Sequence, residues 1–244
     1  MYLEYKGSKI YYTIKGKGKP ILFLHGWGGS VISFKGLFDY LCNKHKCISL
    51  DFPSFGKSEE PKVPYDLYDY LNIVKIILEK NNIEKVSVVA HSFGCRVAIL
   101  LSSKTNLVDK MVFTGAAGIK PKNTLKKIFR KLRYNFYKKL VKWNLLKIDR
   151  LKTFESEDYK KLSPVMKNTF KNIVNIDLKN MLEYIDAEVV LFWGEKDTET
   201  PLYMAKIMKN KIKDSCLISY KDCGHFCYLE KFYEFKKITS EFLI

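Results

Sequence analysis

Short apolar runs recur along the chain and predict buried strands. They cover residues 21–24, 47–50, 86–90, 111–114, 189–192 and, more weakly, 217–220. A strand that is buried on both faces is apolar throughout rather than at alternate positions. Two earlier runs, at residues 2–5 and 10–14, are separated by Gly7 and Ser8, which predicts a hairpin near the start of the chain.

Helical spacing appears between these runs. Leu67, Leu71, Val74 and Leu78 fall on one face of a helix over residues 65–81. Further helices are predicted over residues 93–103, 203–211 and 229–242. Strands that alternate with helices indicate an α/β fold, with a mostly parallel eight-stranded sheet covered by helices on both faces. Functional residues are then expected at the carboxyl ends of the strands.

One long segment interrupts the alternation. Residues 118–185 contain no clear strand, and apolar residues between 125 and 143 recur at helical spacing with lysines and arginines at most other positions. We interpret residues 118–185 as a helical cap inserted into a core formed by residues 1–117 and 186–244. A basic amphipathic helix can also lie on an anionic membrane, so a weak contact of that kind is the alternative reading.

The net charge of +17 raises the question of an anionic partner. Lysine far outnumbers arginine, and the sequence has no interleaved arginine and aromatic motif of the kind that binds nucleic acid. We therefore expect no nucleic-acid partner and attribute the charge to lysine-favouring codons. The chain has neither a signal-like start nor an uncharged apolar run of about 18 residues. These features favour a cytoplasmic protein with reduced cysteines.

Ser92 is the candidate nucleophile. It lies in Ala-His-Ser-Phe-Gly, residues 90–94, between a predicted strand and a predicted helix. A strand that turns sharply into a helix presents the serine at the apex, and small residues such as Gly94 allow the close backbone approach. The position between a buried strand and a helix makes this short pattern specific.

A nucleophilic serine needs a base, and the chain has four histidines. His91 adjoins Ser92 and is expected to point away, while His45 lies in a polar stretch expected at the surface. His25 is expected to brace the loop that follows residues 21–24. His225 lies in a loop after the last predicted strand, where a base is needed, and is therefore the candidate base.

An acid and an oxyanion hole complete the constellation. Asp197 follows the strand at 189–192 and is the candidate acid, with Glu195 as the alternative in the same turn. The order Ser92, Asp197, His225 is the one expected for this strand and helix arrangement. The glycine-rich segment 25–30 lets the backbone approach a ligand, so the N–H groups of Trp27 and Phe93 are the predicted oxyanion donors.

Together these motifs resemble the α/β-hydrolase superfamily. The segments that carry the resemblance are residues 25–28, 51–58, 90–94, 194–197 and 224–225. They look most like a capped bacterial branch that includes carboxylesterases and carbon–carbon bond hydrolases of aromatic degradation. Haloalkane dehalogenases and epoxide hydrolases of this fold carry aspartate at the elbow, where this chain has Ser92. The carbon–carbon hydrolases usually have a second glycine after Gly94, and here Cys95 takes that place.

The resemblance implies this fold, the triad of Ser92, Asp197 and His225, and the oxyanion hole. With these groups we expect a serine hydrolase that cleaves a carboxylic ester or thioester, with a medium-sized acyl or aromatic group. Phe34 and Trp143 are predicted to line the acyl pocket, and no metal or organic cofactor is expected. Three alternatives stay open: a carbon–carbon bond hydrolase, a lipid hydrolase at a membrane surface, and a small-molecule receptor that keeps the fold without turnover.

Overall fold

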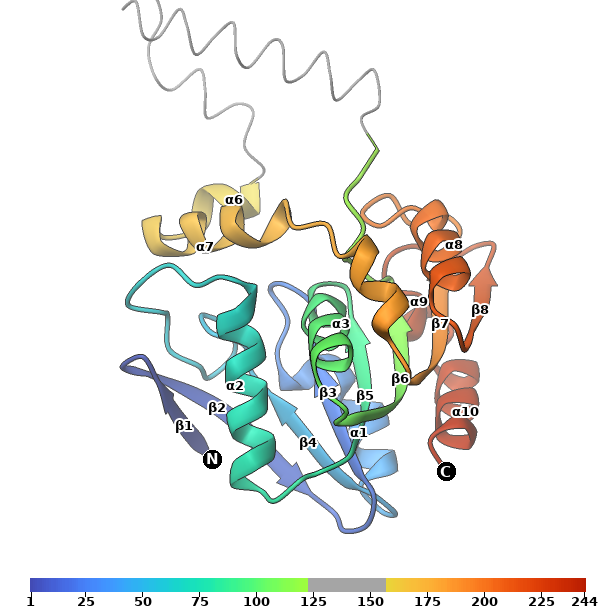
Figure 1. Ribbon diagram of the computed structural model, residues 1–244, viewed down its shortest axis with the longest axis horizontal. Coiled ribbons are helices and arrows are strands. Elements are labelled where there is room, and N and C mark those ends of the chain that lie inside the picture. Colours follow the sequence, from blue (N-terminus) through green and yellow to red (C-terminus); the bar gives the residue numbers. More distant parts are fainter. Residues whose placement is uncertain (123–156) are drawn as a thin grey trace, which may run out of the picture.

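The computed structural model describes residues 1–122 and 157–244, and these residues form one eight-stranded sheet (Figure 1). The strand order is β1-β2-β4-β3-β5-β6-β7-β8. The pairs β1–β2 and β2–β4 are antiparallel and all other neighbours are parallel, which confirms the predicted fold class. The strands are β1 (Tyr2–Tyr5), β2 (Ser8–Lys15), β3 (Pro20–Leu24), β4 (Lys46–Leu50), β5 (Val86–His91), β6 (Val108–Thr114), β7 (Glu188–Gly194) and β8 (Ser215–Tyr220).

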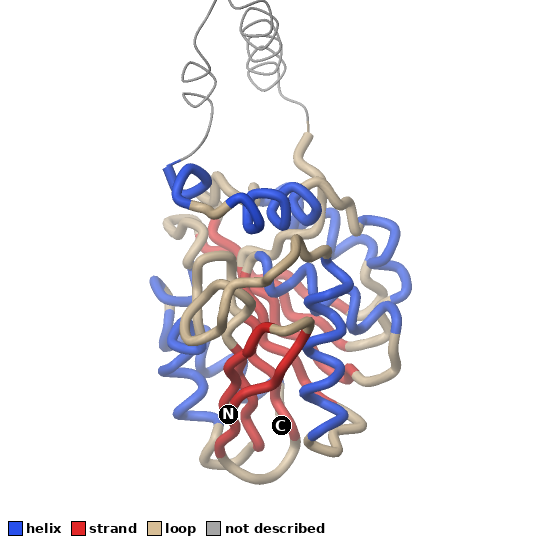
Figure 2. The backbone as a smooth tube through the Cα atoms, turned by 90° about the vertical axis from the view of Figure 1, so that its left-hand side faces the viewer, coloured by secondary structure: helices blue, strands red, loops and turns tan. Residues whose placement is uncertain are grey.

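Helices cover both faces of the sheet (Figure 2). In β3, Leu22 and Leu24 pack into one hydrophobic cluster while Ile21 and Phe23 pack into the other, as the two-residue period of a strand requires. The first cluster includes α2, α3, α8 and η2, and the second includes α1, α9 and α10. Their bounds are η1 (Val31–Phe34), α1 (Lys35–Leu41), α2 (Leu67–Lys80), α3 (Phe93–Lys104), η2 (Lys179–Tyr184), α8 (Leu202–Lys211), α9 (Cys227–Glu230) and α10 (Phe232–Phe242).

Some elements differ from the sequence prediction. Helix α2 begins later than predicted because the Asp66 side chain accepts the Tyr68 and Asp69 N–H groups and thereby caps the helix. The helix predicted over 229–242 is two helices, because the backbone leaves helical geometry at Lys231. Helix α1 was not predicted, since its apolar residues face the second cluster along only two turns.

Two helices from the predicted cap, α6 (Glu157–Lys161) and α7 (Pro164–Val174), lie across the top of the molecule in Figure 1. Polar contacts tie α7 to the loop before α2. The Tyr65 N–H donates to Thr169 Oγ1 at 3.0 Å, and Asn172 Nδ2 donates to the Tyr65 carbonyl at 3.2 Å. The predicted basic helix over residues 125–143 lies outside the described residues.

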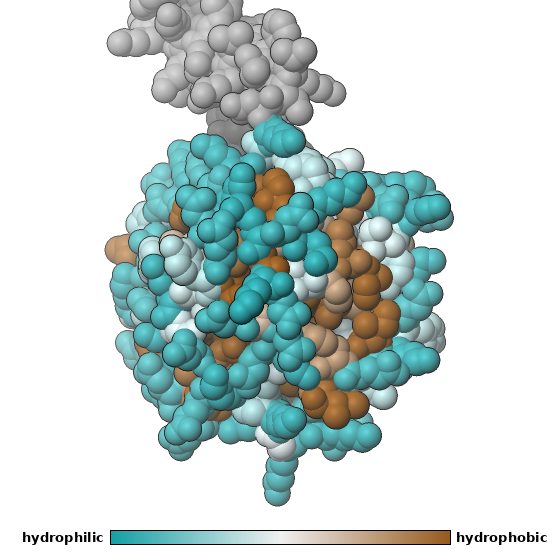
Figure 3. Space-filling view, turned by 45° about the vertical axis from the view of Figure 1, so that its right-hand side comes forward, coloured by the Kyte–Doolittle hydropathy of each residue, from teal (hydrophilic) through white to brown (hydrophobic). Residues whose placement is uncertain are grey.

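Hydrophilic side chains cover most of the face in Figure 3, with apolar strips between them. In the part of the chain that the structure describes, no helix is both long and apolar enough to cross a bilayer. All six cysteines are free.

Candidate active site

A sharp turn joins β5 to α3, and Ser92 stands at its apex. The Ser92 backbone has φ +47° and ψ −111°, a strained conformation for a residue with a side chain. Its N–H donates to the Thr114 carbonyl at 3.1 Å, which ties the turn to β6. A Cβ atom on Gly94 would lie 2.3 Å from the Leu24 carbonyl oxygen, so only glycine fits there. This geometry presents the Ser92 side chain beyond the strand end.

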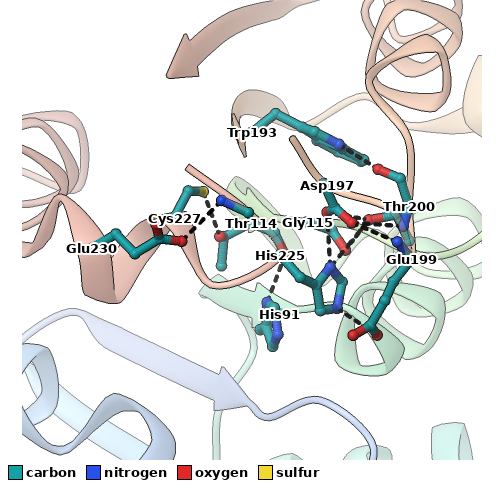
Figure 4. A network of polar contacts seen from close by, with 11 residues as sticks. His91, Thr114, Gly115, Trp193, Asp197, Glu199, Thr200, His225, Cys227 and Glu230 are labelled. Atoms are coloured by element: carbon teal, nitrogen blue, oxygen red, sulfur yellow. Dashed lines mark hydrogen bonds and ion pairs between the residues drawn. The ribbon is translucent and has the colours of Figure 1, made fainter. Parts of the chain in front are cut away.

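His225 and Asp197 follow the neighbouring strands β8 and β7, and their side chains meet (Figure 4). His225 Nδ1 lies 2.8 Å from Asp197 Oδ2, and both residues are buried. Burial raises the pKa of Asp197, but hydrogen bonds from His225 and Thr200 outweigh that effect and hold the pKa below its ordinary value. An ionised Asp197 keeps the imidazole proton on Nδ1, which leaves Nε2 able to accept a proton.

Ser92 and His225 line one pocket of about 680 Å³. The pocket lies between the elbow and the α6–α7 segment, and most of its other lining residues are apolar. The apolar lining residues include Trp27, Phe93, Ile119, Leu162, Phe170, Ile173 and Met204. On the side of His225, Nε2 lies 3.4 Å from Oε2 of Glu199, whose side chain is 65% exposed. Ser92 and the His225 imidazole therefore line the same pocket, whose other walls are mostly apolar.

The loop after β3 lies directly against the elbow. A Cβ atom on Gly26 would lie 2.8 Å from Cδ2 of His91 and 3.3 Å from the Ser92 Cβ. His25 braces this loop: its Nδ1–H donates to the Gly26 carbonyl at 2.7 Å, and its Nε2 accepts the Phe52 N–H at 2.9 Å. Burial lowers the pKa of His25 to about 4, so the ring is neutral and can accept that hydrogen bond.

Two residues that line the pocket, Trp27 and Phe93, have backbone N–H groups without a partner in the described residues. Within residues 1–122 and 157–244, the N–H groups of Trp27 and Phe93 donate to no backbone or side-chain acceptor. The two side chains are in edge-to-face contact, with ring centroids 5.5 Å apart. Unpartnered N–H groups beside a pocket can bind a ligand oxygen.

A model of the family described as the alpha/beta hydrolase fold matches residues 19–145, which is more than half of the chain. The chain belongs to the α/β-hydrolase fold family. Family membership makes this protein a hydrolase, and the predicted superfamily resemblance is confirmed.

Relatives and solved structures agree with this assignment. The hydrolase is 26% identical to the AB hydrolase superfamily protein YisY of Bacillus subtilis, over 93% of this chain and 92% of that protein. Its fold matches an esterase from Exiguobacterium antarcticum with a TM-score of 0.76, at 21% identity over 96% and 95% of the two chains. It also matches a meta-cleavage product hydrolase from Pseudomonas fluorescens with a TM-score of 0.74, at 19% identity over 100% and 97% of the two chains.

The hydrolase departs from the predicted pocket at Phe34. This side chain is 3% exposed and packs against Phe23 and Tyr228 in the second hydrophobic cluster, whereas its neighbour Ser33 lines the pocket. Phe34 is near the loop in sequence, but its direction within η1 turns it toward the sheet. Trp143, the other predicted pocket residue, lies outside the described residues.

Two predictions about histidines, those for His91 and His45, were wrong. His91 does not point away from the site, because its ring centroid lies 4.7 Å from that of His225. Its Nδ1–H donates to the Thr114 carbonyl at 2.9 Å, and burial, followed by the charge of His225, lowers its pKa to about 3. His45 is not a surface residue, since only 8% of it is exposed.

Thr200 is a site residue that was not predicted from the sequence. Its Oγ1 lies 2.8 Å from Asp197 Oδ2 and 3.1 Å from the Gly115 carbonyl oxygen. Its backbone N–H donates to Asp197 Oδ1 at 2.9 Å. The signal that could have found it is local: an aspartate side chain in a turn often accepts the backbone N–H two residues on, here that of Glu199, which brings the next residue, Thr200, close to the carboxylate. Glu195, the alternative acid, instead accepts a hydrogen bond from Ser219 at 2.9 Å.

The described part of the hydrolase holds no group of three His, Cys, Asp or Glu side chains arranged to bind a metal ion. Cys227 flanks His225 in sequence but is fully buried, with its Sγ atom 3.4 Å from the Thr114 hydroxyl. Burial raises the pKa of Cys227 to about 11, so its thiol stays protonated near neutral pH.

Proposed function

We propose that this hydrolase cleaves a carboxylic ester, or a thioester, through an acyl-enzyme on Ser92. The observation that carries the proposal is the buried pair of Asp197 and His225, 2.8 Å apart, with His225 lining the same pocket as Ser92. A structural role alone needs no ionised aspartate beside an imidazole whose second nitrogen faces a pocket.

In the first half of the reaction, Ser92 Oγ bonds to the carbonyl carbon while His225 Nε2 takes the hydroxyl proton. Asp197 stabilises the imidazolium that forms. The carbonyl oxygen becomes an oxyanion and accepts hydrogen bonds from the N–H groups of Trp27 and Phe93. When the C–O bond to the alcohol breaks, His225 returns the proton to the departing alkoxide, and the acyl group stays on Ser92.

In the second half, a water molecule attacks the acyl carbon while His225 takes one of its protons. Collapse of the second tetrahedral intermediate releases the acid, and the proton on His225 returns to Ser92 Oγ. The cycle requires only these side chains, two backbone N–H groups and water. Loss of one oxyanion donor costs about 2.7–4 kcal/mol of barrier in a comparable enzyme.

The apolar lining and the volume of about 680 Å³ suit a medium-sized acyl group. The solved esterase with the same fold is named for ester cleavage, which agrees with this proposal. A relative that is 27% identical over 46% of this chain is named as a hydrolase of a hexadienoic acid. Carbon–carbon bond hydrolysis, the alternative raised by the sequence, is therefore the activity that competes with ester hydrolysis.

The test is hydrolysis of p-nitrophenyl esters from acetate to decanoate by the wild type and by Ser92→Ala. We expect kcat/KM to peak at one chain length and to fall by at least about 10³-fold in the variant. A fluorophosphonate probe should add its mass to the peptide that contains Ser92.

Ser103→Ala is the matched control, because Ser103 lies on α3, the helix that follows Ser92, and its hydroxyl bonds only to the Leu100 carbonyl in the described residues. It should keep wild-type activity. Activity that survives in Ser92→Ala would refute the nucleophile assignment. A wild type that cleaves a dienoic carbon–carbon substrate but no ester would replace this proposal with the competing one.

A further inference from the structure

Arg96 is a buried cation in the wall of the pocket. It lies on α3 one turn beyond Ser92, is 6% exposed, and is among the residues that line the pocket. Ser92 is the N-cap residue of α3 and lies just before the helix, with a non-helical backbone. The guanidinium is therefore carried by the helix that begins directly after the candidate nucleophile.

Among the described residues, Arg96 donates its hydrogen bonds to backbone carbonyl groups alone. Nη1 donates to the Ile173 and Ile176 carbonyls at 3.4 and 2.8 Å, and Nη2 donates to the Val174 carbonyl at 3.3 Å. These carbonyls lie at the carboxyl end of α7, where a helix carries about half a negative charge. Arg96 thus holds α7 against the core, but its full positive charge is only partly balanced.

No carboxylate within residues 1–122 and 157–244 forms an ion pair with Arg96. Asp177 attracts it only from beyond ion-pair distance. Burial lowers the pKa of Arg96 to about 10, so the group is still a cation near neutral pH. Buried charges are ordinarily paired, because an unpaired charge is costly in an apolar environment.

Some N–H bonds of the guanidinium also have no hydrogen-bond acceptor in the described residues. An arginine has five N–H bonds, and the three contacts above use the two on Nη1 and one on Nη2. Nε–H and the second Nη2–H have no acceptor in the described part of the chain. Nε–H and one N–H of Nη2 form one edge of the planar guanidinium group, which is the arrangement that binds both oxygens of a carboxylate.

We propose that Arg96 binds a carboxylate at the far end of the substrate's acyl chain, so that the preferred substrate is a half-ester of a dicarboxylic acid. This inference rests on the proposed function, since it specifies the substrate class of the same site. The acyl part is the one that stays on Ser92, and Arg96 lies on α3, the helix that begins directly after Ser92. A single guanidinium carries one positive charge, which balances one carboxylate, whereas a phosphate group carries close to two negative charges near neutral pH.

Glu199 places a negative charge on the His225 side of the pocket. Its carboxylate lies beside His225, whereas Arg96 contacts the end of α7. A substrate carboxylate is repelled from the His225 side and attracted to Arg96, which leaves its ester group at Ser92. Because the Glu199 side chain is mostly exposed, solvent weakens its contribution, and Arg96 supplies most of the selectivity.

The test compares half-esters with length-matched neutral esters. The p-nitrophenyl half-esters of glutaric, adipic and suberic acid are paired with the pentanoate, hexanoate and octanoate esters, and spontaneous hydrolysis is subtracted. We expect the wild type to favour the half-ester in at least one pair by about 10- to 100-fold in kcat/KM, as hydrogen bonds to a charged group allow. In Arg96→Gln this ratio should fall to about one or below.

Two further variants separate charge from the anchoring of α7. Arg96→Lys keeps a cation but lacks the guanidinium edge with two N–H donors, so it should retain part of the preference for half-esters. This variant also keeps the test usable if Arg96→Gln fails to fold. Asn172→Ala removes an α7 anchor outside the pocket and should leave the ratio at its wild-type value. A wild-type ratio near one in every pair, or a ratio unchanged in Arg96→Gln, would overturn the inference.

A binding measurement keeps this inference distinct from the proposed function. Calorimetry with Ser92→Ala should detect adipate binding that weakens with salt and is lost in the Ser92→Ala/Arg96→Gln double variant. Adipate binding without any ester hydrolysis would refute the acyl-enzyme and leave the carboxylate site standing. Hydrolysis of neutral esters without adipate binding would refute the carboxylate site and leave the acyl-enzyme standing.

Discussion

Replacing Thr200 by valine tests whether the turn around Asp197 supports catalysis. The Thr200 hydroxyl has one proton, and donation to the Asp197 carboxylate at 2.8 Å is stronger than donation to the neutral Gly115 carbonyl at 3.1 Å. Valine has a similar shape, so the main loss is this hydrogen bond. A hydrogen bond to a charged group contributes about 1.5–3 kcal/mol.

We expect two consequences in Thr200→Val. The pKa of Asp197 rises toward its ordinary value because one of the hydrogen bonds that lower it is gone. An aspartate with a depressed pKa stabilises the fold above its unfolded pKa, and that stabilisation is lost as pH falls through the folded pKa. The variant should therefore lose this stabilisation at a higher pH than the wild type. Because Asp197 also stabilises the imidazolium, kcat should fall about tenfold or more.

The assay is kcat on the best p-nitrophenyl ester, together with urea unfolding from pH 7 down to pH 3. Thr200→Ser is the matched control, because it keeps the hydroxyl and removes only a methyl group, and it should recover most of kcat. Wild-type kcat in Thr200→Val, with an unchanged pH dependence of unfolding, would refute the role assigned to this hydroxyl.

Two further predictions concern the fold around the site. Gly94→Ala should destabilise the protein by about 3 kcal/mol or more, because the new methyl group would lie 2.3 Å from the Leu24 carbonyl oxygen; a melting temperature equal to that of the wild type would refute it. His25 and His91 are buried as neutral rings with folded pKa values of about 4 and 3, below the unfolded value near 6.5. The unfolded chain therefore binds more protons as pH falls below 6.5, and stability should fall by up to about 2 kcal/mol per histidine between pH 7 and pH 5. Denaturant unfolding at both pH values measures this loss, and equal stabilities would contradict it.

The architecture could be predicted from the sequence because its signals are local. Buried parallel strands are apolar throughout, as residues 21–24 and 86–90 show, and a strand running into a small-residue turn and a helix specifies the elbow at Ser92. The candidate residues Asp197 and His225 were found in the same way. Each follows a strand, and the carboxyl ends of adjacent parallel strands meet at one edge.

Side-chain direction could not be read from the sequence. Phe34 lies close in sequence to the pocket loop but points into the core, while His91 contacts His225 although a sharp turn was expected to separate them. Both outcomes depend on which face of an element meets which neighbour. That choice is made by packing between residues far apart in the chain.

The role of Arg96 was likewise decided by the tertiary structure. In the sequence it is one basic residue in an apolar helix of a basic chain. Only the fold brings the carboxyl end of α7, some 80 residues later, onto its guanidinium, with Nη1 2.8 Å from the Ile176 carbonyl oxygen. The sequence by itself determined the sheet, the elbow and the order of the candidate catalytic residues, because short-range patterns encode them. The tertiary structure decided which charges and rings line the pocket, because long-range packing alone sets their burial and their partners.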